Sequence, residues 1–244
     1  MKLSIILPIK NESENIVKVL ELLEENIKDI DYELVFVNDF SDDNSYEIIS
    51  EKKKNNNKIK LLNNNIKGLG GAITLGIEKS EGTAICIMMA DLSDDISDLK
   101  KYYKTIQEEN LDAVFGSRFI KGANVSGYPI KKLVLNRIFN YLTKFLFLSN
   151  YNDFTNAFKI YKKKALINSM PLVSESFNIF LEMPLKIISR KMKYKIIPVS
   201  WRRRERGKAK FNIKELKSKY LFTLIYCFLE KNLLKKYLDK NTNK

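Results

Sequence analysis

The first half of the chain alternates short apolar runs with segments whose apolar residues recur at helical spacing. The strand-like runs are residues 3–9, 33–38, 58–62, 84–89 and 112–116. The segments between them, of which 16–27 is the clearest, place apolar residues three or four positions apart. Strands that alternate with helices predict a mostly parallel sheet with helices on both faces. The sequence therefore predicts an α/β fold.

The second half has a different pattern. Residues 130–148 are rich in Leu, Ile and Phe but interrupted by Lys and Asn, which is typical of an amphipathic helix. Shorter elements are expected at 157–161 (strand), 179–190 (helix) and 194–200 (strand). From residue 213 the chain alternates Lys with Leu, Phe and Tyr. We expect one globular domain over 1–212 and a basic amphipathic helical tail over 213–244.

The charge of the chain limits the kinds of partner to expect. Its 43 Lys and Arg against 29 Asp and Glu give a formal net charge of +14. This excess favours an anionic partner, although a solvated basic surface is the alternative. The chain has no histidine, which excludes histidine-based catalysis and histidine metal ligands. Cys86 and Cys227 lie far apart in apolar runs, as expected for buried free thiols in a reducing compartment.

We expect neither a signal peptide nor a membrane span in this sequence. The apolar run at 1–9 contains Pro8 and meets Lys10 and Glu12 without a small-residue cleavage site. The longest apolar run, 220–229, is shorter than the roughly 18 to 20 residues that a span needs.

Polar side chains follow several predicted strands at their carboxyl ends. They are Asn11 and Glu12, Asn38 and Asp39, Asp91 with Ser93, and Ser117 with Arg118. Ligands of parallel α/β sheets bind beyond these ends, so convergence of acids and an arginine there favours a binding site. Asn11, with Glu14 three residues on, is also expected to cap the next helix. Asp94 and Asp95 are expected to cap the helix at 95–109.

These clusters lie in segments that resemble the family 2 glycosyltransferases, which have a nucleotide-sugar-binding GT-A fold. SIILPIKNESENI resembles the opening of that family, VFVNDFSDDNS its acidic second-strand motif, and MMADLSDD its Asp-Ala-Asp metal motif. Four later segments resemble the branch of the family that uses polyprenol phosphate, which includes the dolichol-phosphate mannosyltransferases. They are FGSRFIKGANVSGYPIKK, NDFTNAFKIYKKKAL, FNIFLEMPLK and WRRRERGKAKF. The likeness spans about residues 2 to 212.

The resemblance implies roles for individual residues. The nucleotide-sugar would be held by Pro8, Asn11, Glu12, Asp39 and Asp91. A divalent metal, Mg²⁺ or Mn²⁺, would be bound by Asp91 and Ser93. Donor or acceptor phosphates would be bound by Arg118, Lys132, Arg204 and Lys210, since Arg captures phosphate with two hydrogen bonds. Asp91 and Arg118 are the candidate catalytic residues.

The sequence also departs from the family pattern. The departures are Asn38, Phe40, Met89, Asn156, Ala157 and Ala209. Met89 stands where the metal motif has its first Asp, and a thioether is a poor ligand for a hard cation. Three alternatives stay open: the enzyme uses metal through Asp91 alone, it relies on basic residues instead, or it has lost activity.

The reaction that the resemblance implies is inverting transfer of one sugar, mannose by likeness alone, from a GDP- or UDP-sugar to polyprenyl (dolichyl) phosphate. A phosphate monoester, with a second pKa of about 6, is largely a dianion at neutral pH and needs no general base. A hydroxyl acceptor needs a carboxylate, for which Glu182 is the candidate. The alternatives are transfer to another glycan or lipid, and a catalytically silent homologue that binds nucleotide-sugar or membrane.

The basic tail predicts a cytoplasmic protein bound peripherally to the inner, anionic face of the membrane. The alternative is a helix docked on the domain's own core. Whether a membrane partner protein takes part stays open. Nucleic-acid binding through WRRRERGKAK is disfavoured, because the strand-end acids would repel a phosphate backbone.

Overall fold

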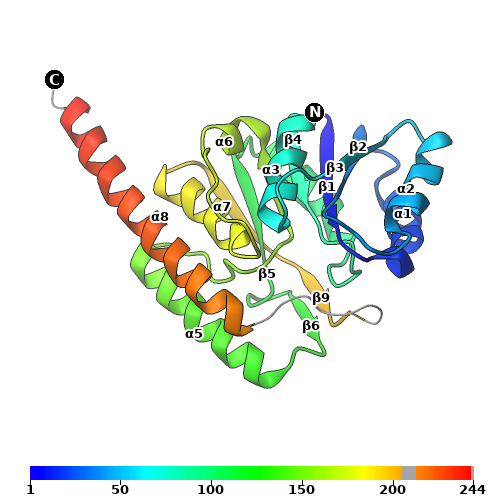
Figure 1. Cartoon of the computed structure of the whole chain (residues 1–244). Coiled ribbons are helices and arrows are strands. Elements are labelled where there is room, and N and C mark those ends of the chain that lie inside the picture. The colour runs from blue at the N-terminus through cyan, green and yellow to red at the C-terminus, as the bar shows by residue number, and fades with distance from the viewer. Residues whose placement is uncertain (205–212, 243–244) are drawn as a thin grey trace.

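A seven-stranded sheet forms the centre of the protein (Figure 1). The computed structural model describes residues 1–204 and 213–242, and in the last helix only the side chains of 218–233. The strand order is β3 (Ile59–Asn63), β2 (Tyr32–Asn38), β1 (Leu3–Ile9), β4 (Ala84–Ile87), β7 (Lys159–Lys162), β5 (Ala113–Ser117) and β8 (Tyr194–Pro198). Strand β7 runs antiparallel to both neighbours, and the other pairs are parallel. The predicted α/β fold with a mostly parallel sheet is confirmed.

Helices cover both faces of the sheet. The helices on one face are α1 (Ser13–Ile27), α2 (Ser45–Lys54) and α4 (Asp98–Glu108). Those on the other face are α3 (Leu69–Lys79), α6 (Lys163–Ile167) and α7 (Ile179–Ser189). Strand β1 shows why the sheet is apolar on both sides, because Ile5 packs into one core cluster and Ile6 into the other.

Helices α5 (Ile130–Phe147) and α8 (Ile213–Thr242) lie side by side at one end of the molecule (Figure 1). The rings of Phe147 and Phe228 contact each other with centroids 6.2 Å apart, and Lys231 Nζ donates to the Phe147 carbonyl at 2.9 Å. Helix α8 also packs on α7, and Leu224 and Cys227 are buried there. Among the described helices, none combines the length and the apolar character that crossing a bilayer requires.

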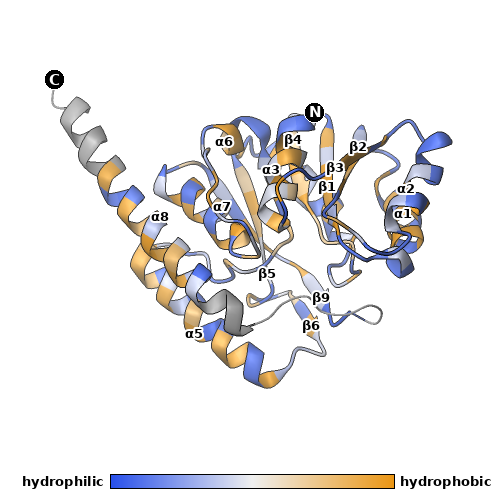
Figure 2. Ribbon diagram, viewed as in Figure 1, coloured by the Kyte–Doolittle hydropathy of each residue, from blue (hydrophilic) through white to orange (hydrophobic). Residues whose placement is uncertain are grey.

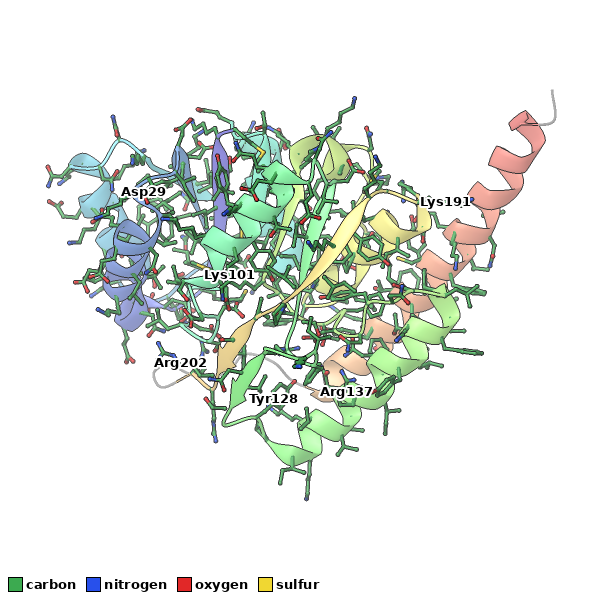
Figure 3. The ribbon with its side chains drawn as sticks, turned by 180° about the vertical axis from the view of Figure 1, so that it is seen from behind. Asp29, Lys101, Tyr128, Arg137, Lys191 and Arg202 are labelled. Carbon is green, nitrogen blue, oxygen red and sulfur yellow. The ribbon has the colours of Figure 1, made fainter. Side chains whose placement is uncertain are left out.

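A second, two-stranded ribbon pairs β6 (Asn124–Ser126) with β9 (Ser200–Arg202) (Figure 3). The rings of Tyr128 and Trp201 lie 5.0 Å apart beside it. The sequence did not predict this ribbon, because three-residue strands carry no readable periodicity.

Two capping predictions are wrong. Helix α1 begins at Ser13 with Glu12 as its N-cap residue, and Asn11 adopts a positive φ of 51°. The Asn11 Oδ1 instead accepts the Asp42 amide proton at 2.7 Å, which links the loop after β1 to the loop after β2. Helix α4 begins at Asp98 with Ser97 as its N-cap residue, so neither Asp94 nor Asp95 is its cap.

Candidate functional site

The carboxyl ends of β2, β1 and β4 lie next to one another, because these strands are neighbours in the sheet. Glu12 follows β1, Asp39 follows β2 and Asp91 follows β4. We call this the donor edge, after the sugar donor that the resemblance would place here, and define it by Glu12, Asp39 and Asp91. The structure therefore brings together three acids that the sequence placed at strand ends.

Asp39 is buried and holds the loop that leads into α3. Its Oδ1 accepts hydrogen bonds from the Asn64 side-chain amide and the Gly68 backbone, both at 2.8 Å. Gly68 has a φ of 122°, a conformation that a side chain would strain. Sequence reasoning missed Asn64, and only its position directly after β3 could have indicated it. Pro8 is buried within β1.

Arg204 joins the two other acids of the donor edge. Its Nη2 lies 3.0 and 3.2 Å from the two carboxylate oxygens of Glu12, and 3.4 Å from Asp91 Oδ2. Asn15 adds a second donor to Glu12, at 2.9 Å from Oε2. The Arg204 side chain is only 14% exposed, so the ion pairs are largely shielded from water.

The side chains around Asp91 do not fit a divalent cation. The Asp91 Oδ1 accepts the Ser93 backbone N–H at 3.0 Å, and Oδ2 faces Arg204. Met89 packs against the apolar core and supplies no hard ligand. Within the described residues, no three Asp, Glu, His or Cys side chains gather as they do around a metal ion.

Arg118 is buried against Asp153. Its Nε and Nη2 donate to the two carboxylate oxygens at 2.8 and 2.7 Å, and its backbone N–H donates to Asp153 Oδ2 at 3.0 Å. Burial opposes the guanidinium charge, but Asp153 outweighs it and raises the pKa of Arg118. The phosphate-binding and catalytic roles of Arg118 stay predictions. Sequence reasoning missed Asp153, which lies 35 positions away.

The remaining predicted residues are spread more widely. Lys132 is exposed in the first turn of α5, and Lys210 lies outside the described residues. Glu182 is fully buried, accepts the Val173 and Ser174 amide protons, and pairs with Lys186 at 3.2 Å. These contacts occupy both of its oxygens, so it is poorly placed to act as a base.

Asp94, which the sequence analysis assigned to helix capping, is a buried carboxylate whose charge interacts with that of Asp91. Burial, with the nearby charge of Asp91, raises the pKa of Asp94 to about 7. Its backbone forms a bridge with Trp201, which ties the segment after β4 to β9.

The fold matches that of a solved enzyme. The crystal structure of glucosyl-3-phosphoglycerate synthase from Mycobacterium tuberculosis with Mn²⁺, UDP-glucose and phosphoglyceric acid superposes with a TM-score of 0.69 at 13% identity, over 93% of this chain and 79% of that one. At such low identity the likeness shows the GT-A fold alone.

Curated relatives match part of the sequence. A dolichol-phosphate mannosyltransferase of Pyrococcus furiosus is 28% identical over 137 residues, which cover 56% of this chain and 39% of that protein. An undecaprenyl-phosphate 4-deoxy-4-formamido-L-arabinose transferase of Proteus mirabilis is 29% identical, over 44% of this chain and 34% of that protein. The chain thus spans well under half the length of these relatives. The model of Glycosyl transferase family 2 matches residues 4–169, and the chain belongs to this family.

Proposed function

We propose that the protein transfers a sugar from a nucleotide-sugar to polyprenyl phosphate while bound to an anionic membrane surface. The observation that carries this proposal is the outward apolar face of α5 and α8, attached to a glycosyltransferase domain. Polyprenyl-phosphate substrates named for the two curated relatives support the same acceptor class.

Helix α5 exposes a broad apolar side, while its buried side includes the polar residues Asn140 and Thr143 beside Phe147. Asn140 and Thr143 are fully buried, and Asn140 Oδ1 accepts the Phe154 amide proton at 2.6 Å. The exposed side carries Ile130, Val134, Leu135, Ile138, Tyr141, Leu142 and Phe145, each at least 47% exposed. A surface helix usually exposes polar residues, so this broad exposed apolar side favours an apolar or interfacial neighbour.

Helix α8 extends the same face. Its exposed apolar residues are Leu221, Phe222, Ile225, Leu229 and Leu233, each at least 51% exposed. Figure 2 shows hydrophobic residues along both helices. We call this surface the α5–α8 face, defined by the twelve residues named here and for α5.

We assign an anionic membrane surface as the occupant of the α5–α8 face. Exposed Lys131, Lys132 and Lys219 lie on the two helices that form it, and the chain carries a net charge of +14. Apolar side chains flanked by lysines bind the boundary between head groups and acyl chains of anionic bilayers. Polyprenyl phosphate is itself a membrane lipid, so acceptor and docking surface agree. Buried free thiols at Cys86 and Cys227 support the cytoplasmic side of the membrane.

The proposed chemistry is a single displacement. An oxygen of the acceptor phosphate attacks the anomeric carbon, the bond from that carbon to the donor diphosphate breaks, and the electron pair leaves with the nucleoside diphosphate. The configuration of the sugar inverts. Because the phosphate is already deprotonated near neutral pH, the step needs no general base, which agrees with the engagement of Glu182 elsewhere.

The test is sugar transfer to a short-chain polyprenyl phosphate, with GDP-mannose, UDP-glucose and related donors compared. We expect turnover with one donor and none with a polyprenol that lacks the phosphate. Mannose is the first sugar to test. Transfer to the free hydroxyl of a glycan instead would refute polyprenyl phosphate as the acceptor. Donor binding without transfer to any acceptor would indicate a catalytically silent homologue.

A further inference from the structure

The position expected for a divalent cation is already next to a positive charge. Resting on the proposed function, we infer that the Arg204 guanidinium takes the place of the metal in this protein, so that the nucleoside diphosphate binds without a divalent cation. Two independent features support this: the carboxylate is lost at Met89, and an arginine lies on the carboxylate that remains, Asp91.

The geometry of Arg204 suits this role. A single Nη2 lies within 3.4 Å of both Glu12 and Asp91, which come from the ends of the neighbouring strands β1 and β4. Glu12 is further held by the Asn15 amide and by its own N–H, which donates to Ser45 Oγ at 2.9 Å. Two carboxylates from two strands thus share one cation, as they would share a metal.

Charge balance explains why a cation is needed there. Glu12, Asp39 and Asp91 give the donor edge a negative field that repels a diphosphate. A positive group at Asp91 offsets part of that field and stabilises the charge that develops on the leaving diphosphate. A guanidinium does so without metal, because it has five N–H donors arranged to bind two phosphate oxygens at once.

The first test needs no variant. The intrinsic fluorescence of Trp201, the single tryptophan and close to Arg204 in sequence, reports binding as UDP or GDP is titrated into the full chain. Calorimetry provides a second readout. We expect dissociation constants with EDTA and with Mn²⁺ or Mg²⁺ to agree within about twofold. A requirement for metal, seen as at least tenfold weaker binding in EDTA, would overturn the inference and leave the proposed function standing.

A swap of cations sharpens the test. In EDTA, Arg204→Gln is expected to weaken nucleoside diphosphate binding by about tenfold or more, the size of a lost charged hydrogen bond. Arg203→Gln is the matched control, because Arg203 is exposed and expected to leave affinity unchanged. The double change Met89→Asp with Arg204→Gln restores a carboxylate pair, so its binding should recover when Mn²⁺ is added and not otherwise.

The outcomes separate the two proposals. Unchanged affinity in Arg204→Gln would show that Arg204 does not serve as the cation. Absence of UDP and GDP binding in the unmodified chain, with and without metal, would refute both the inference and the proposed donor class. Metal-independent binding that disappears with Arg204 supports both.

Discussion

The donor edge and the α5–α8 face place their side chains in opposite ways. At the donor edge, acids are largely shielded from water and held by named donors, as Asp39 is by Asn64 and Glu12 by Arg204. On the α5–α8 face, large apolar side chains are open to solvent, with Phe145 75% exposed and Ile130 77% exposed. Each region reverses the usual placement of polar groups outside and apolar groups inside.

The difference shows how the two regions act. A buried, hydrogen-bonded acid has its position and charge set before a ligand arrives, which suits recognition of one substrate. An exposed apolar stripe has no fixed partner and gains free energy only when something removes it from water. The first region is held by contacts within the chain, whereas the second is open to the membrane surface that we propose as its partner.

Breaking the buried pair of Arg118 and Asp153 tests how much the fold depends on charges held inside. Asp153→Asn leaves the guanidinium without a counter-charge, so we expect the free energy of unfolding to fall by about 3 to 5 kcal/mol. Denaturant unfolding followed by circular dichroism measures it. Asp29→Asn is the control, because Asp29 pairs with Lys100 in solvent and should change stability by less than about 1 kcal/mol. Equal losses of unfolding free energy in the two variants would show that the buried pair of Arg118 and Asp153 matters no more than an exposed pair.

Lys159 extends the same test to pH. Its buried Nζ donates to the Phe154 and Phe180 carbonyls at 3.1 and 3.3 Å, and burial lowers its pKa from 10.5 to about 7, against the attraction of Asp153. Between these values the unfolded chain carries the proton and the folded chain does not. The free energy of unfolding should therefore rise with pH, by at most about 3 kcal/mol between pH 7 and pH 9. The free energy of unfolding of Lys159→Met, measured by denaturant unfolding at each pH, should lack that rise. Parallel pH profiles for this variant and the unmodified chain would contradict the role of Lys159.

Much of the fold could be predicted from sequence because buried parallel strands read as uninterrupted apolar runs. The strand at Leu3–Ile9 matches its predicted bounds, and the helix predicted over 179–190 forms as Ile179–Ser189. The expectation that polar residues at the carboxyl ends of parallel strands converge also placed Glu12 and Asp91 correctly at one edge of the sheet. The reversed direction of β7 was not predictable, since a strand sequence does not encode the direction of its neighbours.

Other features depend on contacts between distant residues. Arg204 and Glu12 are 192 positions apart, and no local pattern indicates that they pair. Helix α5 illustrates a second limit. Its periodicity predicted an amphipathic helix correctly, but periodicity does not tell whether the apolar side faces the core or the solvent. Buried Asn140 and exposed Phe145 became apparent only in the structure.

Asp91→Asn tests whether the donor edge performs the chemistry. It removes the negative charge that attracts the Arg204 guanidinium, whose Nη2 lies 3.4 Å from Asp91 Oδ2. We therefore expect sugar transfer to slow by about 100-fold, a typical loss when a charge-stabilising group is misplaced. Asp91 is 19% exposed, and stability should change by less than about 1 kcal/mol. Steady-state transfer kinetics measure the effect. Asp95→Asn, an exposed acid in the same segment, is the control, and equal rates in the two variants would place the site elsewhere.

The smallest expected effect comes from the α5–α8 face. Phe145→Glu puts a charge where an apolar ring should enter the bilayer boundary, and loss of one buried ring corresponds to about tenfold weaker binding to vesicles containing anionic lipid. Flotation with anionic vesicles measures the affinity. Ile167→Glu is the matched control, because Ile167 is 53% exposed on α6 and belongs to no part of this face. Donor binding should be unchanged in both variants. Equal vesicle affinity for Phe145→Glu and the unmodified chain would show that the lysines, and not the apolar side chains of the α5–α8 face, account for binding.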